Sequence, residues 1–352
     1  MKISFYNLYI IIFCILTSCI DPVQLDVAGE DKFLVIVGEI TNFEESYKVR
    51  IFESAQQKSG KINLTNPISN AEVKIWSQDG ENVILNEDEP GQYMSKLGEL
   101  VGQTGKQYYL EVKLSDGKEY RSTPEYIDQA TPISNVSFEF VPEEQLNQFE
   151  NIIIKNMLKV FVDVELIENR EETFLKWEVN GEYQFNEYRF PGPDVVNRTC
   201  YVLDNLPLGD VEILKASSND QIDISKIEIK SVKVNHKFAS NYCFHIRQET
   251  LSLGAYDYWG KIKKITESEG SLFENPFGRV KGNIRNVNDS NDEVMGYFSA
   301  SGIAMEKAFV PSEIVNNPKS PCPTYRDPIL GPACRDCLTL KKSSLIKPAY
   351  WP

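Results

Sequence analysis

The sequence predicts a mainly β protein, in which an N-terminal β-sandwich is followed by a larger β-rich domain that carries one prominent helix. Short runs such as residues 47–52 and 71–76 alternate apolar and polar side chains, which is the period of half-buried strands. Asp79-Gly80 and Asp116-Gly117 follow two of these runs and favour tight hairpins, because glycine accepts a positive φ. The clearest helical period lies at about residues 255–269.

Residues 1–18 are predicted to be a signal peptide. Lys2 is the only charged residue before Cys19, and residues 8–16 are apolar apart from Tyr9, as in a secretory signal. This core is too short to span a bilayer, which takes about 20 apolar residues. Ser18-Cys19 resembles the lipobox of bacterial lipoproteins, in which the cysteine thiol receives a diacylglyceryl group and cleavage leaves that cysteine first. We therefore expect Cys19 to be the lipid anchor and residues 19–31 a tether. An ordinary signal peptide cut elsewhere, or a buried strand, is the alternative.

Residues 32–128 are expected to form the first sandwich, with further strands near residues 33–37 and 109–114. This region resembles carboxypeptidase-regulatory-like and immunoglobulin-like modules, which are spacers and docking platforms without catalytic activity. The residues that carry the resemblance are Pro67, Ala71-Glu72-Val73, Gly80, Gly91-Gln92-Tyr93 and Tyr108.

Residues 131–352 are expected to form the second domain, because Thr123-Pro124 and Thr131-Pro132 mark a boundary. Its candidate strands are residues 133–140, 159–166, 173–179, 200–203, 222–234 and 241–253. Residues 143–157 are interpreted as a short helix.

The helix at about residues 255–269 presents an apolar stripe. Tyr258, Ile262 and Ile265 are spaced i, i+4 and i+7, and Gly270 follows as a C-cap. Tyr256, Tyr258 and Trp259 are possible partner contacts or a platform for stacking sugars. At helical spacing, however, such aromatic residues more often pack a helix onto a sheet, and we favour that interpretation.

The charge balance argues against binding to nucleic acid. The chain has 51 acidic and 37 basic residues and a formal net charge of −14. Such a surface repels phosphate backbones, which are bound through lysine and arginine.

Five cysteines remain once Cys14 leaves with the signal peptide and Cys19 takes lipid. An exported chain lies in an oxidising compartment, so we expect disulfides within the set Cys200, Cys322, Cys334 and Cys337, whose three possible pairings stay open. Cys243 lies in an apolar, strand-like stretch and is predicted to be the free thiol. Zinc at Cys322, Cys334 and Cys337 is a weaker alternative, because no fourth ligand accompanies them.

The sequence does not single out a catalytic or metal site. The two histidines, His236 and His245, lack a Gly-x-Ser-x-Gly partner motif, and His245 is expected to be a hydrogen-bonded structural residue. Asp289, Asn291 and Glu293 alternate as at the start of a calcium loop, but Val294 occupies the position at which an EF-hand needs glycine. We expect no catalytic residue, no metal and no cofactor besides the lipid on Cys19.

Several motifs in fixed order resemble a Bacteroidota lipoprotein family, domain of unknown function 4249. They are the lipobox, Val37-Gly38-Glu39-Ile40, Tyr256-Asp257-Tyr258-Trp259, Gly282-Asn283-Ile284, Gly296-Tyr297-Phe298-Ser299-Ala300-Ser301, Cys334-Arg335-Asp336-Cys337 and Lys347-Pro348-Ala349-Tyr350-Trp351. The chain departs from the family pattern at residues 340–343, where a turn containing glycine is expected. The resemblance implies an outer-membrane lipoprotein associated with TonB-dependent receptors.

We therefore expect a non-enzymatic accessory protein, anchored by lipid in the outer membrane and favouring its outer surface, that binds a TonB-dependent β-barrel transporter or its cargo. One alternative is a hydrolase of surface polymers, with two carboxylates of divergent pKa in a cleft between the domains. The other is a carbohydrate-binding protein, which would need Trp76, Trp177 or Trp259 exposed on a flat face.

Overall fold

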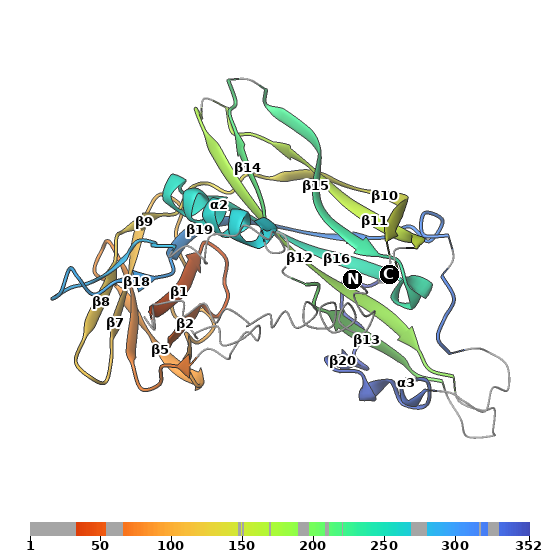
Figure 1. Cartoon of the computed structure of the whole chain (residues 1–352), viewed down its shortest axis with the longest axis horizontal. Coiled ribbons are helices and arrows are strands. Elements are labelled where there is room, and N and C mark those ends of the chain that lie inside the picture. Colours follow the sequence, from red (N-terminus) through yellow and green to blue (C-terminus); the bar gives the residue numbers. More distant parts are fainter. Residues whose placement is uncertain are drawn as a thin grey trace, which may run out of the picture.

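A computed structural model describes residues 33–53, 66–146, 149, 151–168, 170–188, 197–207, 211–219, 221–268, 280–316, 318–322 and 331–352. The predicted signal peptide, Cys19, the tether and Gly270 lie outside these residues. Over the described residues the protein is mainly β with one long helix, which confirms the predicted fold class (Figure 1).

The first sandwich consists of two sheets that share β5. One sheet contains β1 (Leu34–Thr41), β2 (Lys48–Glu53), β3 (Asn66–Pro67), β5 (Asn82–Glu89) and β6 (Gln92–Met94). The other contains β5, β4 (Glu72–Ser77), β7 (Gln107–Lys113), β8 (Glu119–Ser122) and β9 (Glu125–Tyr126). Alternate residues of each strand point inward, so that Ile36, Val49 and Ile75 are fully buried in one core.

The second part of the molecule is also built from two packed sheets. The smaller sheet contains β10 (Ile133–Leu146), β11 (Ile152–Glu165) and β15 (Asp223–Lys233). The larger contains β12 (Thr173–Asn186), β13 (Thr199–Asp204), β14 (Glu212–Ala216), β16 (Tyr242–Leu251), β19 (Phe298–Phe309) and β20 (Ser343–Ser344). Side chains from both sheets form one core, in which Phe138 of β10 stacks on Phe244 of β16.

Strand β19 joins the two parts, and segments beyond the boundary expected between residues 128 and 131 also contribute to the first sandwich. Its beginning lies parallel to β1, and β18 (Val294–Met295) also pairs with β1. In addition, β17 (Ile284–Asn286) pairs with β8. The chain therefore returns to the first sandwich after building most of the second part, because the open edges of β1 and β8 accept these strands.

Helix α2 (Leu253–Ser268) confirms the predicted helix. Figure 1 shows it lying across the region where the two parts of the molecule meet. Ala255 and Tyr258 are buried in a small core with Phe174 and Tyr297. The Ser252 Oγ atom accepts a hydrogen bond from the Ala255 N–H at 3.2 Å and caps the first turn.

The short helix expected at residues 143–157 is wrong. The described residues of this stretch belong to a long hairpin, in which β10 and β11 pair from Ile133↔Val164 to Leu146↔Ile152. The run Ile152-Ile153-Ile154 is β-branched and therefore favours extended backbone.

Three turns contain a residue with a positive φ. Gly80 and Gly117 have φ values of 87° and 91° in the β4–β5 and β7–β8 hairpins. Lys342 has a φ of 59°, so the turn at residues 340–343 adopts the left-handed conformation that glycine favours. Two 3₁₀ turns, η1 (His236–Ala239) and η2 (Cys337–Thr339), and the short helix α3 (Pro332–Arg335) complete the described elements. None of the described helices is long and apolar enough to cross a bilayer.

Candidate functional site

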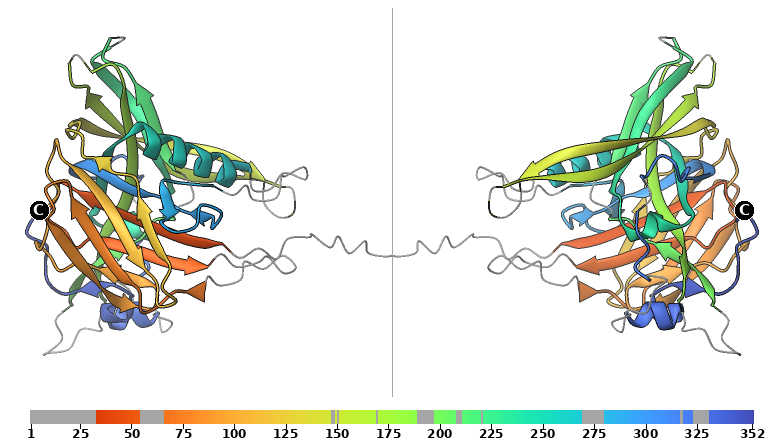
Figure 2. Two further views of the ribbon diagram at one scale, coloured as in Figure 1. Left: turned by 90° about the vertical axis from the view of Figure 1, so that its left-hand side faces the viewer. Right: turned by 90° about the vertical axis from the view of Figure 1, so that its right-hand side faces the viewer.

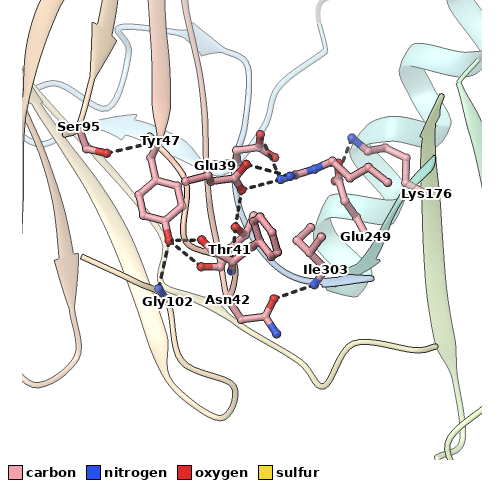
Figure 3. A network of polar contacts seen from close by, with 12 residues as sticks. Glu39, Thr41, Asn42, Tyr47, Ser95, Gly102, Lys176, Glu249 and Ile303 are labelled. Carbon is pink, nitrogen blue, oxygen red and sulfur yellow. Dashed lines mark hydrogen bonds and ion pairs between the residues drawn. The ribbon is translucent and has the colours of Figure 1, made fainter. Parts of the chain in front are cut away.

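Five charged residues meet where the first sandwich joins the larger sheet of the second part (Figure 3). We call them the junction cluster: Glu39, Glu45, Lys176, Arg247 and Glu249. Lys176 and Glu249 are direct cross-strand neighbours on β12 and β16, and Arg247 and Glu249 lie on the same face because strand side chains repeat every second residue. Glu39 comes from β1 and Glu45 from the loop that follows it.

Arg247 is the centre of the cluster. Its guanidinium donates to both carboxylate oxygens of Glu45, each at 2.9 Å. It also lies 3.7 Å from Glu39 and 3.6 Å from Glu249. The Lys176 Nζ atom lies 2.9 Å from Glu249 Oε2. A bidentate guanidinium–carboxylate pair is geometrically specific, so this contact fixes the loop at residue 45 to β16.

The cluster contains one more carboxylate than it has cations, and the surplus affects Glu39. Burial, together with the negative charge of Glu249, raises the pKa of Glu39 from 4.5 to about 7. Burial lowers the pKa of Lys176, but Glu249 and Glu39 more than offset this, so that its pKa is raised overall. The Glu39 side chain is 39% exposed, so it can exchange a proton with solvent near neutral pH.

A network of uncharged contacts supports the end of β1 beside this cluster (Figure 3). The Tyr47 hydroxyl donates to the Thr41 carbonyl at 2.8 Å and accepts from the Gly102 N–H at 3.2 Å. The Ser95 hydroxyl accepts from the Tyr47 N–H at 2.9 Å. These contacts fix the position from which Glu39 and Glu45 reach Arg247.

Sequence reasoning missed the junction cluster, although one signal was present. Arg247 and Glu249 interrupt a strand whose other residues are largely apolar, and buried charges in a strand need partners. The partners come from three other segments that local patterns do not connect.

The end of the β10–β11 hairpin is a second candidate site. β15 pairs with β11 only from Met157 to Glu165, so the last residues of the hairpin form a two-stranded ribbon. Figure 2 shows the hairpin reaching the margin of the molecule. It carries four large apolar side chains that are 67–72% exposed and that we call the hairpin tip: Leu146, Phe149, Ile152 and Ile154.

Three residues of the hairpin tip share one face of the ribbon. Leu146 lies directly opposite Ile152, and Ile154 follows on the same face of β11. Exposed groups of large apolar residues mark interaction surfaces more often than single ones do. The apolar triplet at residues 152–154 within a polar stretch was the sequence signal for this surface.

The three aromatic residues considered as partner contacts pack against other residues of the molecule; Tyr258 is buried, and Tyr256 and Trp259 are partly buried. The ring of Tyr258 lies 5.2 Å from that of Tyr297. Tyr256 packs on Phe174 with ring centroids 4.9 Å apart. The Lys176 Nζ atom lies 4.5 Å from the centre of the Trp259 ring. Packing of the helix on its neighbours, the favoured interpretation, is confirmed.

The tryptophans do not form the exposed platform that carbohydrate binding requires. Trp177 is buried, and its indole N–H donates to Gln248 at 2.7 Å. Trp76 is partly buried and stacks on Tyr109. With Trp259 also partly covered, none of the three residues presents an open face.

The disulfides use the four predicted cysteines. Cys200 pairs with Cys337 and Cys322 with Cys334, which selects one of the three pairings. Cys243 is the buried free thiol, as predicted, and burial raises its pKa to about 12.

Two clusters of polar contacts hold the disulfide-bonded tail in place. Arg198 pairs with Glu187 and Asp336, each at 2.6 Å, and Glu187 accepts from the Cys337 N–H at 2.7 Å. Further along, the Tyr350 hydroxyl donates to Glu182 and lies 3.1 Å from His245 Nε2.

His245 is therefore hydrogen-bonded, as expected. Burial lowers the pKa of its ring. Within the described ranges no group of three or more metal-ligating side chains occurs. The residues that follow Asp289 form a turn, and the Asp292 carboxylate beside it accepts a hydrogen bond from the Tyr120 hydroxyl at 2.8 Å.

A shallow hollow of about 330 Å³ lies between β10 and β19. Its lining residues are Ile133, Ser134, Asn135, Val136, Glu306 and Ala308. It contains one carboxylate, whereas the hydrolase alternative calls for two in one cleft.

Comparison with known proteins adds one finding. A family model described as Domain of unknown function (DUF4249) matches residues 20–307. No curated protein matches the chain.

Proposed function

The chain belongs to the family described as domain of unknown function 4249, as its motifs predicted, and we propose that it is a lipid-anchored binding protein of the outer membrane. In this proposal Cys19 carries the lipid and residues 19–31 form the tether. The first sandwich acts as a spacer or docking platform. The second part contacts a TonB-dependent β-barrel transporter, or its cargo, at the cell surface.

The hairpin tip is the observation that carries this proposal. Leu146, Phe149, Ile152 and Ile154 remain 67–72% exposed at the end of a two-stranded ribbon. Exposed apolar area costs free energy that is recovered when a partner covers it. A two-stranded ribbon is also marginally stable by itself, so a partner that covers the tip would order the ribbon as well.

The proposal is tested by purifying the tagged protein from gently solubilised outer membranes. The wild-type chain is compared with Cys19→Ala, which cannot be lipidated, and with a triple variant, Phe149→Ser, Ile152→Ser and Ile154→Ser. A matched control, Leu97→Ser, removes an exposed apolar side chain from the first sandwich. All substituted positions other than Cys19 are exposed, so folding should be retained.

We expect a large β-barrel protein to be recovered in stoichiometric amount with the wild type and with Leu97→Ser, and to be lost with Cys19→Ala and with the triple variant. Recovery of the lipoprotein alone in every case would refute the partnership, and glycan and peptide screening would then follow. Equal recovery of the barrel with the triple variant would refute the assignment of the contact to the hairpin tip.

A further inference from the structure

Strand β19 pairs with one strand on each of its two sides, but over different residues. It pairs with β16 from Gly302 to Phe309, and on its other side it pairs with β1 from Phe298 to Ser301. Among the described strands, no further one pairs with the β1 side of β19. The C-terminal half of β19 is therefore a sheet edge on that side.

Hydrogen bonds show which residues of β19 face this edge. The Tyr297 carbonyl accepts from the Gly38 N–H at 3.1 Å, and the Ser301 carbonyl accepts from the Asn42 N–H at 3.4 Å. The Ile303 N–H then donates to the Asn42 side chain at 2.8 Å, as Figure 3 shows. Successive residues of a strand direct their N–H and C=O groups to opposite sides, so the odd-numbered residues face the β1 side.

The opposite side of β19 gives the same assignment. The Val310 N–H donates to the carbonyl of Tyr242 in β16 at 2.9 Å. This contact continues the β16–β19 pairing one residue beyond Cys243↔Phe309. Even-numbered residues therefore face β16. Beyond Ile303, the main-chain groups of Met305, Lys307 and Phe309 point outward, and we call these three residues the open edge. The Lys307 N–H donates to its neighbour Glu306 at 3.3 Å, a long contact that a better acceptor can replace.

The open edge borders the hollow of about 330 Å³ between β10 and β19. Of its six lining residues, Glu306 is the charged one. Ile133, Val136 and Ala308 provide apolar walls around it. A side chain with an aliphatic stem and a cationic end fits this combination, because the stem can lie along the apolar walls while the charge meets Glu306.

We propose that the open edge binds an extended polypeptide segment by strand addition, with a lysine or arginine side chain placed in the hollow. The incoming segment would occupy the same side of β19 as β1. There β1 pairs with β19 as far as Ser301, and the Asn42 side chain bonds to the Ile303 N–H. A polypeptide is the matching ligand because the open edge presents a donor and an acceptor at every second residue, and another extended backbone repeats these groups at the same spacing. This inference depends neither on the lipid anchor nor on the hairpin tip.

Amide hydrogen exchange of the free protein, followed by NMR, tests the geometry. The N–H groups of Met305, Lys307 and Phe309 should exchange at least tenfold faster than those of the even-numbered residues from Ala304 to Ala308, which are bonded to β16. Equal protection of both sets would overturn the proposal, because the main-chain groups of the open edge would then already have hydrogen-bond partners. Protection that grows with protein concentration would also overturn it, since a second copy would then be the occupant.

Binding is tested with the peptide acetyl-Thr-Val-Lys-Val-Thr-amide and with a version that has glutamine in place of lysine. Millimolar lysine peptide should slow exchange at the open edge and leave the even-numbered amides unchanged. The glutamine peptide should bind about two- to fivefold more weakly, as expected for the loss of one partly exposed ion pair. No change at the open edge with either peptide would overturn the proposal.

Two variants make the test specific. Lys307→Pro removes an outward N–H without removing a bond to β16, a position at which a sheet edge tolerates proline, and it should abolish peptide binding. Glu306→Gln keeps the backbone intact and should remove the preference for lysine over glutamine. If Lys307→Pro does not fold, Glu306→Gln decides: retention of the lysine preference in that variant would refute the placement of the cation in the hollow.

Discussion

Replacing Glu39 by glutamine should stabilise the protein at alkaline pH. Glu39 is the carboxylate for which the junction cluster has no matching cation, because Arg247 is engaged by Glu45 and Lys176 by Glu249. Burial and the charge of Glu249 raise the pKa of Glu39 from 4.5 to about 7. The folded state therefore binds the Glu39 proton more tightly than the unfolded state does.

The sign of the pH dependence follows from this difference. Between pH 4.5 and about 7 the folded protein holds a proton that the unfolded chain has released, so the free energy of unfolding decreases as pH rises through this range. The favourable contribution of protonated Glu39 is complete below pH 4.5 and lost above about pH 7. A tenfold change in proton affinity corresponds to about 1.4 kcal/mol, which sets an upper limit of roughly 3 kcal/mol for the effect of Glu39. Since Glu39 is 39% exposed, solvent screening reduces the expected value to about 1–2 kcal/mol.

Urea unfolding, followed by tryptophan fluorescence at several pH values, measures this effect. Near pH 4 the wild type and Glu39→Gln should be about equally stable, because Glu39 is then largely protonated in the folded and in the unfolded state and is as uncharged as glutamine. Near pH 8 the variant should be more stable by about 1–2 kcal/mol. Glu45→Gln is the matched control: it weakens the bidentate contact with Arg247 and should destabilise the protein at both pH values. A Glu39→Gln variant that is less stable than the wild type near pH 8, or that keeps the full pH dependence, would refute the account of the cluster.

Two further predictions concern the cysteines. The stabilisation by a disulfide grows with the length of the loop that it closes. The Cys200–Cys337 bond closes a loop of 137 residues and the Cys322–Cys334 bond one of 12. Replacing Cys200 and Cys337 by alanine should therefore cost about 5 kcal/mol of unfolding free energy, and replacing Cys322 and Cys334 about 3 kcal/mol. Thermal and urea unfolding check this order, and a larger loss from the shorter loop would contradict it. Cys243 is buried and its pKa is raised to about 12, so iodoacetamide near pH 8 should modify it only in denaturant. Mass spectrometry reads the result, and rapid modification of the folded protein would show that the thiol is accessible.

Local sequence patterns were sufficient wherever a structural feature depends on neighbouring residues. The period-two runs at residues 47–52, 71–76 and 109–114 predicted strands of the first sandwich, and Asp79-Gly80 and Asp116-Gly117 predicted two of its hairpins. The helix was found from the spacing of its apolar residues, and Cys243 was separated from the other cysteines by its apolar surroundings. The ordered motifs along the chain predicted the family that the family model matches.

Contacts between distant segments were beyond local patterns. The helix expected at residues 143–157 is a hairpin, because pairing between β10 and β11, and of β11 with β15, outweighs local propensity. The pairing of the cysteines likewise depends on where the fold brings their backbones together.

The sequence by itself determined several of the strands, two hairpin turns, the helix, the set of bonded cysteines and the family. The tertiary structure decided that β19 lies between β1 and β16, that Glu39 and Glu45 meet Arg247, and that the outer half of β19 is an open edge. The physical reason is that the alternation of apolar and polar residues shows which face of a strand is buried. Strand order and the pairing of charges depend instead on contacts between segments that lie hundreds of residues apart in the chain.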